Sequence, residues 1–303
     1  MQEFILKNSF LKAHFLDYGA TLHELWVKDK NGNAVNVIMG LPKIDDYLSD
    51  PWYRGAIVGR YAGRLQEKVA VSGKRIALEN SKGVMLHGAS SGWSNKTWDL
   101  KVQSTGETPE ICFEISCANG SSGFPGKVTA QIRYRLEQNS ISLEYRATTD
   151  APTPINLTNH AYFNLGNRTA IDHHQLKINS KQYLELGSDL VPTGKLLSSE
   201  GTPFDFKKRK LLKKTRLDDC FVIDTTEEVA AYLYAENTGI GMKTITDQPG
   251  VVVFTPPDFD AICFETQKFS NGPNIPKFPN TILHPGETYR QTTRYLFNAG
   301  ATE

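Results

Sequence analysis

The sequence predicts an all-β protein, built as a large antiparallel β-sandwich. Short runs rich in β-branched and aromatic residues recur along the chain, and clusters of glycine, asparagine, aspartate and proline separate them. No segment keeps an apolar period of 3.6 residues over several helical turns. Strands at this spacing, without helices between them, favour an antiparallel sandwich or barrel. We expect a single large domain over residues 1–303.

Six runs give the clearest strand signals, and turn-forming residues bound each of them. Residues 137–142 have the composition of a turn that joins two of these runs. In chain order, the predicted strands cover residues 111–117, 128–137, 140–149, 229–236, 251–256 and 261–267.

Length and charge exclude several classes of protein. The 303 residues include 34 lysines and arginines against 33 aspartates and glutamates, a net charge of +1. A chain of this length buries about three quarters of its unfolded surface, so it needs no disulfide or metal for stability. Near-neutral charge gives no general reason to expect nucleic acid. The chain has no apolar run of about 18 residues and no secretory-signal pattern at its start, so we expect no membrane partner.

The four cysteines are Cys112, Cys117, Cys220 and Cys263, and they form no CxxC motif and no cluster with histidine. Cys112 and Cys117 lie five residues apart in one predicted strand, so they should face opposite sides of the sheet. We interpret all four as reduced, mostly buried thiols, which favours a cytoplasmic location. A monomer and a homodimer are both compatible with the sequence.

A basic run stands out between residues 207 and 216. It could be a patch for anions or nucleic acid, or a solvated surface loop. A single run without interleaved aromatic residues is weak evidence for nucleic acid, so the surface loop is favoured. Its cations are Lys207, Lys208, Arg209, Lys210, Lys213, Lys214 and Arg216.

Residues 154–165 are the strongest candidate for function. Interpreted as a strand with a period of two, they alternate an apolar face with a face of hydrogen-bonding groups. Neutral donors and acceptors in a row suit a polyhydroxylated ligand, whereas a merely solvated face usually carries lysine and glutamate. The alternative is an exposed polar face with a structural histidine. The polar face carries Asn156, Thr158, His160, Tyr162 and Asn164.

Residues 261–267 place a carboxylate inside an apolar strand. Alternation puts Cys263, Glu265 and Gln267 on one face, with aliphatic and aromatic residues on the other. Burying a bare charge is costly, so Glu265 must be paired or functional. Partial burial would raise its pKa and suit it to act as a general base near neutral pH. The alternative is an ion pair with an arginine.

Three shorter motifs are weaker when each is taken by itself. His87 precedes Gly88, which would let another group approach closely. Arg60 and Arg64 lie four residues apart, in a stretch without the pattern of a phosphate loop. Asp218 opens a predicted strand and could cap a turn. The sequence has no HExxH or GxGxxG motif and no grouped metal ligands, so we expect no metal or cofactor.

Together and in order, these motifs resemble the aldose 1-epimerase (galactose mutarotase) family over nearly the whole chain. Each motif is weak by itself, but their number and order make the resemblance specific. The matching stretches are residues 17–22, 29–32, 37–40, 53–60, 86–88, 123–126, 156–165, 203–206, 217–218, 264–267 and 282–289.

The resemblance implies a galactose mutarotase-like supersandwich that binds a monosaccharide on its concave face. It implies that His160 is the general acid and Glu265 the general base of anomer interconversion. No metal or nucleotide is implied, because one acid and one base suffice to open and reclose the sugar ring. The resemblance further implies that the sugar hydroxyls are bound, or ring opening is assisted, by Arg64, His87, Tyr162 and Asp218.

The sequence departs from the family pattern among the residues that contact the sugar. Gly63 stands where asparagine is usual, and Val252 stands where relatives have a sugar-contacting glutamine. Asp219 replaces a common histidine, and residues 270–272 replace a proline–aspartate–alanine stretch. The proposed acid and base are retained, so we expect mutarotation but leave the preferred aldose open.

Three functions remain as hypotheses, of which the favoured one is an aldose 1-epimerase acting on free aldohexoses. The second is a hexose-phosphate mutarotase, which should gather extra cations, such as Arg60 or the basic run, beside the sugar. The third is a carbohydrate-binding β-sandwich without catalysis. Loss of His160 or Glu265 would indicate that third function, and both residues are present.

Overall fold

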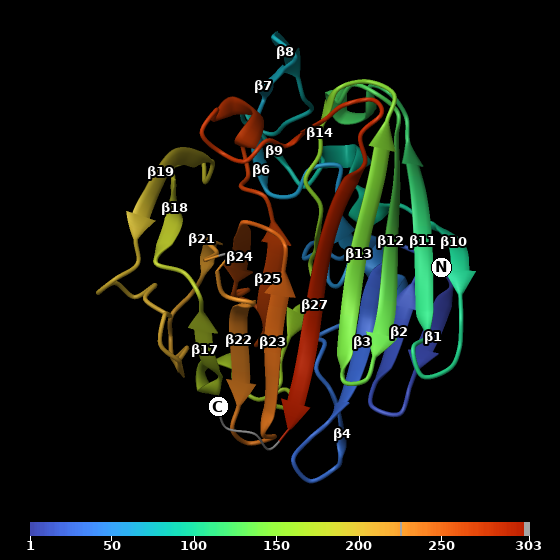
Figure 1. Ribbon diagram of the computed structural model, residues 1–303, viewed down its shortest axis with the longest axis vertical. Helices are drawn as coiled ribbons and strands as arrows, with labels where there is room; N and C mark the ends of the chain where they lie inside the picture. The colour runs from blue at the N-terminus through green and yellow to red at the C-terminus, as the bar shows by residue number, and fades with distance from the viewer. Residues whose placement is uncertain (225, 300–303) are drawn as a thin grey trace.

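The computed structural model describes residues 1–224 and 226–299, and the regular secondary structure in these ranges is almost entirely antiparallel β-strand (Figure 1). Helical structure within these ranges is limited to short 3-10 turns, the longest being Ile44–Ser49. The all-β prediction is therefore confirmed. Each predicted run forms a strand: β11 (Glu110–Cys117), β12 (Val128–Glu137), β13 (Ser140–Thr149), β22 (Val229–Ala235), β24 (Gly250–Phe254) and β25 (Ile262–Gln267).

The largest sheet has nine strands in the order β10-β11-β12-β13-β27-β23-β22-β17-β20. Its long central strands cross the view of Figure 1 side by side. Side chains alternate between the two faces of β12, and every second one from Val128 to Leu136 is buried. One face of this strand therefore packs against the core. The sheet also uses β10 (Asp99–Gln103), β27 (Tyr289–Ala299), β23 (Ile240–Thr246), β17 (Gln175–Ile178) and β20 (Lys210–Leu211).

Two smaller sheets accompany the large one. A four-stranded sheet runs β1-β2-β3-β4, and a six-stranded sheet runs β16-β25-β24-β21-β18-β19. The first contains β1 (Glu3–Lys7), β2 (Lys12–Leu16), β3 (Thr21–Lys28) and β4 (Ala34–Asn36). The second adds β16 (Tyr162–Phe163), β21 (Asp218–Val222), β18 (Gln182–Leu186) and β19 (Pro192–Ser198) to β24 and β25.

Four two-stranded pairs complete the strands of the described chain. The pairs are β14 (Thr153–Pro154) with β26 (Ile282–Leu283), β15 (Thr158–Asn159) with β5 (Ile57–Val58), β6 (Arg64–Gln66) with β9 (Val84–Leu86), and β7 (Lys68–Val71) with β8 (Lys74–Ala77). Of these pairs, β6 with β9 supplies Arg64 and Leu86 to the wall of the cavity described below.

Both smaller sheets pack against the nine-stranded sheet, which confirms the predicted sandwich. The ring of Phe15 on β2 lies 4.7 Å from that of Tyr134 on β12, measured between centroids. Phe163 on β16 lies 4.9 Å from Tyr295 on β27. Burial of such a ring contributes about 1.5–3 kcal/mol. One continuous apolar core contains residues from Leu6 to Phe297. This core supports the prediction of a single domain.

The six-stranded sheet has two different faces. Val253 and Phe264 belong to the core between the sheets. Val252 and Glu265 alternate with them, so they point away from the nine-stranded sheet. Cross-strand register aligns Cys220 with Val252, and Val252 with Glu265. The predicted alternation of residues 261–267 is thus confirmed, and Glu265 lies on the open face of this sheet.

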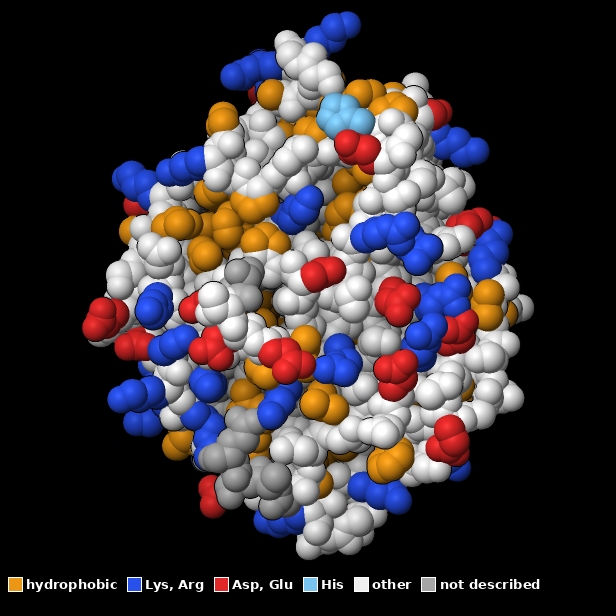
Figure 2. All heavy atoms as spheres, viewed as in Figure 1, with side chains coloured by type: hydrophobic (Ala, Val, Ile, Leu, Met, Phe, Trp, Pro, Cys, Tyr) orange, Lys and Arg blue, Asp and Glu red, His pale blue; other side chains and the backbone are white. Residues whose placement is uncertain are grey.

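All four cysteines are free, and Cys117 alone among them is not fully buried. In the described part of the chain, no helix is long and apolar enough to cross a bilayer. Figure 2 shows basic and acidic side chains interspersed over the face seen in Figure 1.

Candidate active site

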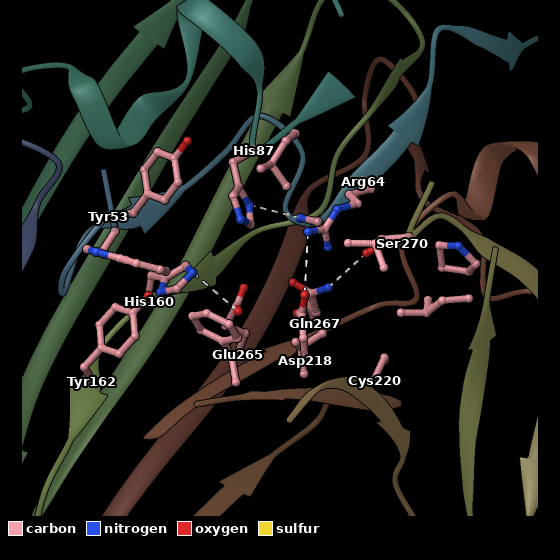
Figure 3. Close-up of a pocket in the computed structure, with 18 of the residues that line it drawn as sticks. Tyr53, Arg64, His87, His160, Tyr162, Asp218, Cys220, Glu265, Gln267 and Ser270 are labelled. Carbon is pink, nitrogen blue, oxygen red and sulfur yellow. Dashed lines mark hydrogen bonds and ion pairs between the residues drawn. The ribbon is translucent and has the colours of Figure 1, made fainter. Parts of the chain in front are cut away.

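A cavity of about 190 Å³ lies over the open face of the six-stranded sheet. It is smaller than the roughly 300–1,000 Å³ of pockets for drug-sized ligands, so it suits a small molecule. Figure 3 shows labelled side chains converging on it from several strands and loops. The cavity brings together the six residues to which the family resemblance assigns roles: Arg64, His87, His160, Tyr162, Asp218 and Glu265.

The segment that supplies His160 and Tyr162 is not the single strand that the sequence predicts. It forms three short pieces, β14, β15 and β16, which pair with β26, β5 and β25 in turn. Residues 153–166 are all buried, so neither face is exposed to solvent. Because the segment changes partners along its length, period-two alternation does not give the surroundings of its side chains.

The hydrogen bonds of Asn156 and Asn164 do not support the interpretation in which the polar face of this segment binds a ligand along its whole length. The Asn156 amide nitrogen donates to the Lys268 carbonyl at 2.9 Å, and its oxygen accepts from the Lys268 N–H at 3.0 Å. Asn164 donates to the carbonyls of Thr169 and Asp260. These amides satisfy backbone groups where regular pairing is interrupted. Like them, Thr158 is buried outside the cavity lining.

His160 and Glu265 form a close pair in the cavity. Their Nε2 and Oε1 atoms lie 3.5 Å apart, and each residue is 4% exposed. Burial lowers the pKa of His160 to about 4. Burial, and then the charge of Asp218, raises the pKa of Glu265 to about 8, although Arg64 acts in the opposite direction. Over the range between these values, the pair holds one proton.

Arg64 and Asp218 face each other across the cavity, with Nη2 and Oδ2 3.6 Å apart. The ion pair of this arginine is therefore with Asp218, which does not support the alternative in which Glu265 is an arginine's structural partner. Both side chains keep partial exposure, at 25% and 42%. They can therefore still exchange hydrogen bonds with a ligand.

The backbone conformation of His87 and a hydrogen bond from Gly63 fix the orientation of its ring. His87 has a positive φ of 52°, and its Nδ1 accepts a hydrogen bond from the Gly63 N–H at 3.2 Å. Burial, followed by the charges of His160 and Arg64, lowers the pKa of His87 well below its ordinary value. A Cβ on Gly88 would lie 2.4 Å from the Gly59 carbonyl oxygen, so the predicted close approach is made by backbone.

The cavity also contains residues that the sequence analysis did not assign to the site. Tyr53 stacks edge-on against His87, with 5.1 Å between ring centroids. Gln267 follows Glu265 by two positions, so alternation alone could have assigned it to the site. Among the described residues, Gln267 Oε1 and the Tyr162 hydroxyl are buried without a hydrogen-bond partner. Both can bond to a ligand.

Gly63 and Ser270 occupy one place in the cavity wall. A Cβ built on Gly63 would lie 1.9 Å from Ser270 Oγ. Gln267 Nε2 donates to the same Oγ at 3.2 Å. The Ser270 hydroxyl thus fills the volume that a side chain at position 63 would need.

The apolar part of the cavity wall comes from β24, from the β18–β19 hairpin, from the end of β9 and from the loop at residues 51–52. Val252 lies opposite Glu265, and Trp52 stacks on Phe254 at 6.0 Å between centroids. These groups help to exclude water from the carboxyl and so contribute to its raised pKa. The remaining apolar lining residues are Pro51, Leu86, Leu186, Leu190 and Pro192.

The structure does not bring Arg60 or the basic run to the cavity. Arg60 is 2% exposed, donates to the Pro125 and Gly126 carbonyls, and stacks on Phe124. Within the described ranges, Arg64 is the only lysine or arginine in the cavity wall. Three residues of the basic run, Lys207, Lys208 and Lys210, instead border a separate surface hollow.

Three ligand-type atoms, on His87, His160 and Glu265, lie within 4.8 Å of one another, close enough to hold a metal ion. A metal would require the carboxylate to be ionised and a ring nitrogen of each histidine to be free. Burial opposes ionisation of Glu265, and Arg64 adds a positive charge beside it. The donor chemistry therefore suits proton transfer better than a metal.

The sequence profile of the family described as aldose 1-epimerase matches residues 2–296. The chain belongs to the aldose 1-epimerase family. This match covers every element that surrounds the cavity, and it confirms the resemblance drawn from the ordered motifs.

Individual members of the aldose 1-epimerase family agree with this assignment. The galactose mutarotase of Homo sapiens is 31% identical, and the alignment covers 98% of this chain and 94% of that protein. The aldose 1-epimerase of Escherichia coli (strain K12) is 30% identical, with 96% and 93% covered. A solved aldose epimerase homologue from C. elegans superposes with a TM-score of 0.92, at 28% identity, and covers 98% of this chain and 99% of that one.

Proposed function

We propose that the chain is an aldose 1-epimerase, an isomerase that interconverts the α and β anomers of free aldohexoses. The observation that carries this function is the pair of His160 and Glu265, 3.5 Å apart in a small cavity of an aldose 1-epimerase family chain. Such a pair supplies the acid and the base that ring opening requires.

Each half of the reaction moves two protons, one onto the base and one off the acid. Glu265 takes the proton of the C1 hydroxyl while His160, in its protonated form, gives one to the ring oxygen. The C1–O5 bond then breaks and leaves an aldehyde, with the remaining proton on Glu265. Rotation about C1–C2 presents the other face of the carbonyl, and the reverse transfers close the opposite anomer. Each positioned acid or base contributes about 10²–10⁴-fold.

The perturbed pKa values favour the ring-closing half of this exchange. Because His160 is lowered to about 4 and Glu265 raised to about 8, their affinities for a proton lie on either side of neutrality. At neutral pH the pair keeps a single proton, with Glu265 as its favoured carrier in the free enzyme. Ring opening also ends with the proton on Glu265 and with His160 neutral. The open-chain intermediate therefore meets the protonation state that reclosure requires.

The other predicted residues surround the pair and offer hydrogen bonds to sugar hydroxyls. His87 and Arg64 supply donors, and Asp218 supplies an acceptor. Tyr162 packs its ring at 5.0 Å from that of His160, measured between centroids, and contributes a buried hydroxyl. We expect these four residues to bind and orient the sugar.

The two alternative functions receive less support. A hexose-phosphate mutarotase needs cations for the phosphate, but Arg60 is engaged by backbone carbonyls and Arg64 faces Asp218. A purely carbohydrate-binding protein has no use for a buried carboxyl held against a histidine, since that burial is costly. The cytoplasmic location and the choice between monomer and homodimer stay predictions.

The test is polarimetry of freshly dissolved α-D-glucose and α-D-galactose, corrected for the spontaneous rate. We expect the protein to accelerate mutarotation and Glu265→Gln to lose at least about 10²-fold in kcat. Glu200→Gln, at an exposed carboxyl outside the cavity, is the matched control and should retain the wild-type rate.

Two results would contradict the proposed function. One is no acceleration with either sugar. The other is a wild-type rate in Glu265→Gln, which would remove the assigned base. Exhaustive chelation should leave the rate unchanged, and a large loss would show that a metal takes part.

A further inference from the structure

Cys263 contacts the side of His160 that faces away from Glu265. Its Sγ lies 3.2 Å from Nδ1 of His160 and 3.0 Å from the carbonyl oxygen of Ala161. The thiol is completely buried and does not line the described cavity. Cys263 is on β25, two residues before Glu265, and pairs with Tyr162. One strand thus supplies both the carboxyl and the thiol that contact this histidine.

The two contacts of the sulfur fix the direction of each hydrogen bond. A carbonyl oxygen can only accept, so the Cys263 S–H donates to Ala161. The single thiol proton is then used, and the sulfur can only accept from Nδ1 of His160. Burial keeps the thiol in its neutral form, because it raises the pKa of Cys263 well above its ordinary value.

We propose that Cys263 is a positioning residue that holds His160 as the Nδ1–H tautomer. Nε2, which faces Glu265 at 3.5 Å, is then the nitrogen that gains and loses a proton. Imidazole orientation and tautomer decide whether a histidine can transfer a proton at a given atom. A thiol behind the ring therefore contributes to catalysis without touching the sugar.

His87 is held in the opposite tautomer. Its Nδ1 accepts the Gly63 N–H, so in the neutral ring the proton is on Nε2. His87 is therefore a fixed donor, while His160 presents a bare nitrogen that exchanges protons. The centroids of the two rings lie 5.6 Å apart. Their Nδ1 atoms have different partners, the Gly63 N–H and the Cys263 sulfur, and this difference gives the two histidines different roles.

The catalytic part of this inference rests on the proposed function, whereas the tautomer can be measured without activity. The groups that titrate around His160 come from several elements and must be considered in any pH profile. They are Tyr53, His87, Tyr162, Cys263 and Glu265.

The experiment combines ¹⁵N NMR of the imidazole nitrogens with polarimetry. His160→Ala assigns the His160 signals. In the wild type at pH 6, we expect a protonated Nδ1 and an Nε2 that lacks its own proton. Cys263→Ala should lose this preference and lower kcat by about 10²-fold with little change in KM. Cys263→Ser should restore both, because a hydroxyl can donate to Ala161 and accept from Nδ1.

Cys112→Ala is the matched control, because Cys112 is another buried thiol on the distant strand β11. It should change neither the His160 signals nor kcat. An Nε2–H tautomer in the wild type would overturn the proposal, even if Cys263→Ala failed to fold. A Cys263→Ala protein with the wild-type tautomer and kcat would also overturn it. The expected tautomer in a protein without mutarotase activity would support the assignment while refuting the proposed function.

Discussion

Burial changes the proton affinity of His160 and Glu265 in opposite directions, and this predicts the pH dependence of activity. Below about pH 4, both groups are protonated and no base remains. Above about pH 8, both are deprotonated and no acid remains. We expect kcat/KM, which reports the free enzyme, to form a plateau between these values.

The measurement is kcat/KM from pH 3.5 to 9.5, after subtraction of the spontaneous rate at each pH. An alkaline fall is expected near pH 8, and it should disappear in Glu265→Gln along with most of the activity. A profile that keeps rising above pH 9 would contradict an essential proton on the pair.

Gly63 and Ser270 predict an energetic coupling between two cavity residues. Gly63→Ala should destabilise the protein by at least about 2 kcal/mol, because φ is +77° and the new Cβ would meet Ser270 Oγ. Ser270→Gly removes the obstruction but not the backbone strain. A double-mutant cycle measured by urea unfolding should therefore show partial recovery, and strictly additive changes would contradict a shared volume.

The surroundings of a single residue could be predicted from the sequence where that residue lies in a regular strand. Glu265 alternates with core residues along β25, so its position and its need for a partner could be predicted. The surroundings of Asn156 and Asn164 could not, because amides that satisfy interrupted backbone look like ligand-binding amides in a sequence. Gly63 and Ser270 are far apart in the chain, so no local pattern could reveal their contact.

The interrupted segment of residues 153–166 positions His160, and its asparagines replace regular strand pairing. Asn156→Ala would leave the N–H and carbonyl of Lys268 without their partners in a partly buried site. At about 1–3 kcal/mol for each of these two groups, we expect a loss of about 2–6 kcal/mol in the free energy of unfolding. Exposed Asn33→Ala is the control and should change it by less than about 0.5 kcal/mol.

Urea unfolding of both asparagine variants measures this difference. A loss below about 1 kcal/mol in Asn156→Ala would show that water replaces the side chain easily. Elements of this kind are difficult to predict, because each short piece is stabilised by a different distant strand. The six regular strands were predictable, since their alternation and turns are local properties of the chain.

The whole molecule is a sandwich whose sheet order depends on distant pairings. Strand spacing predicted the class, and composition predicted free thiols. The order of the nine-stranded sheet, in which β13 lies beside the C-terminal β27 and β27 beside β23, depends on contacts between segments far apart in the chain. Side-chain packing between layers decides that order, so it could not be read from the local patterns.

The site also imposes a cost on the stability of the whole molecule, and this cost depends on pH. Between pH 4.5 and 8 the folded protein keeps a proton on Glu265 that the unfolded chain releases, so stability falls as pH rises. His160 acts in the opposite direction between pH 4 and 6.5, because only the unfolded chain binds its proton there. The two effects oppose each other up to about pH 6.5, and only that of Glu265 continues above it.

Glu265→Gln should therefore be more stable than the wild type at alkaline pH. One proton contributes about 1.4 kcal/mol per pH unit, so the wild type should lose about 2 kcal/mol between pH 6.5 and 8 from this group. Glu265→Gln should lack that loss, whereas Glu200→Gln should keep it. Urea unfolding of the three proteins at both pH values measures the difference. Parallel pH dependences in wild type and Glu265→Gln would mean that the carboxyl ionises in the folded protein without cost, and the buried base would then lose its physical basis.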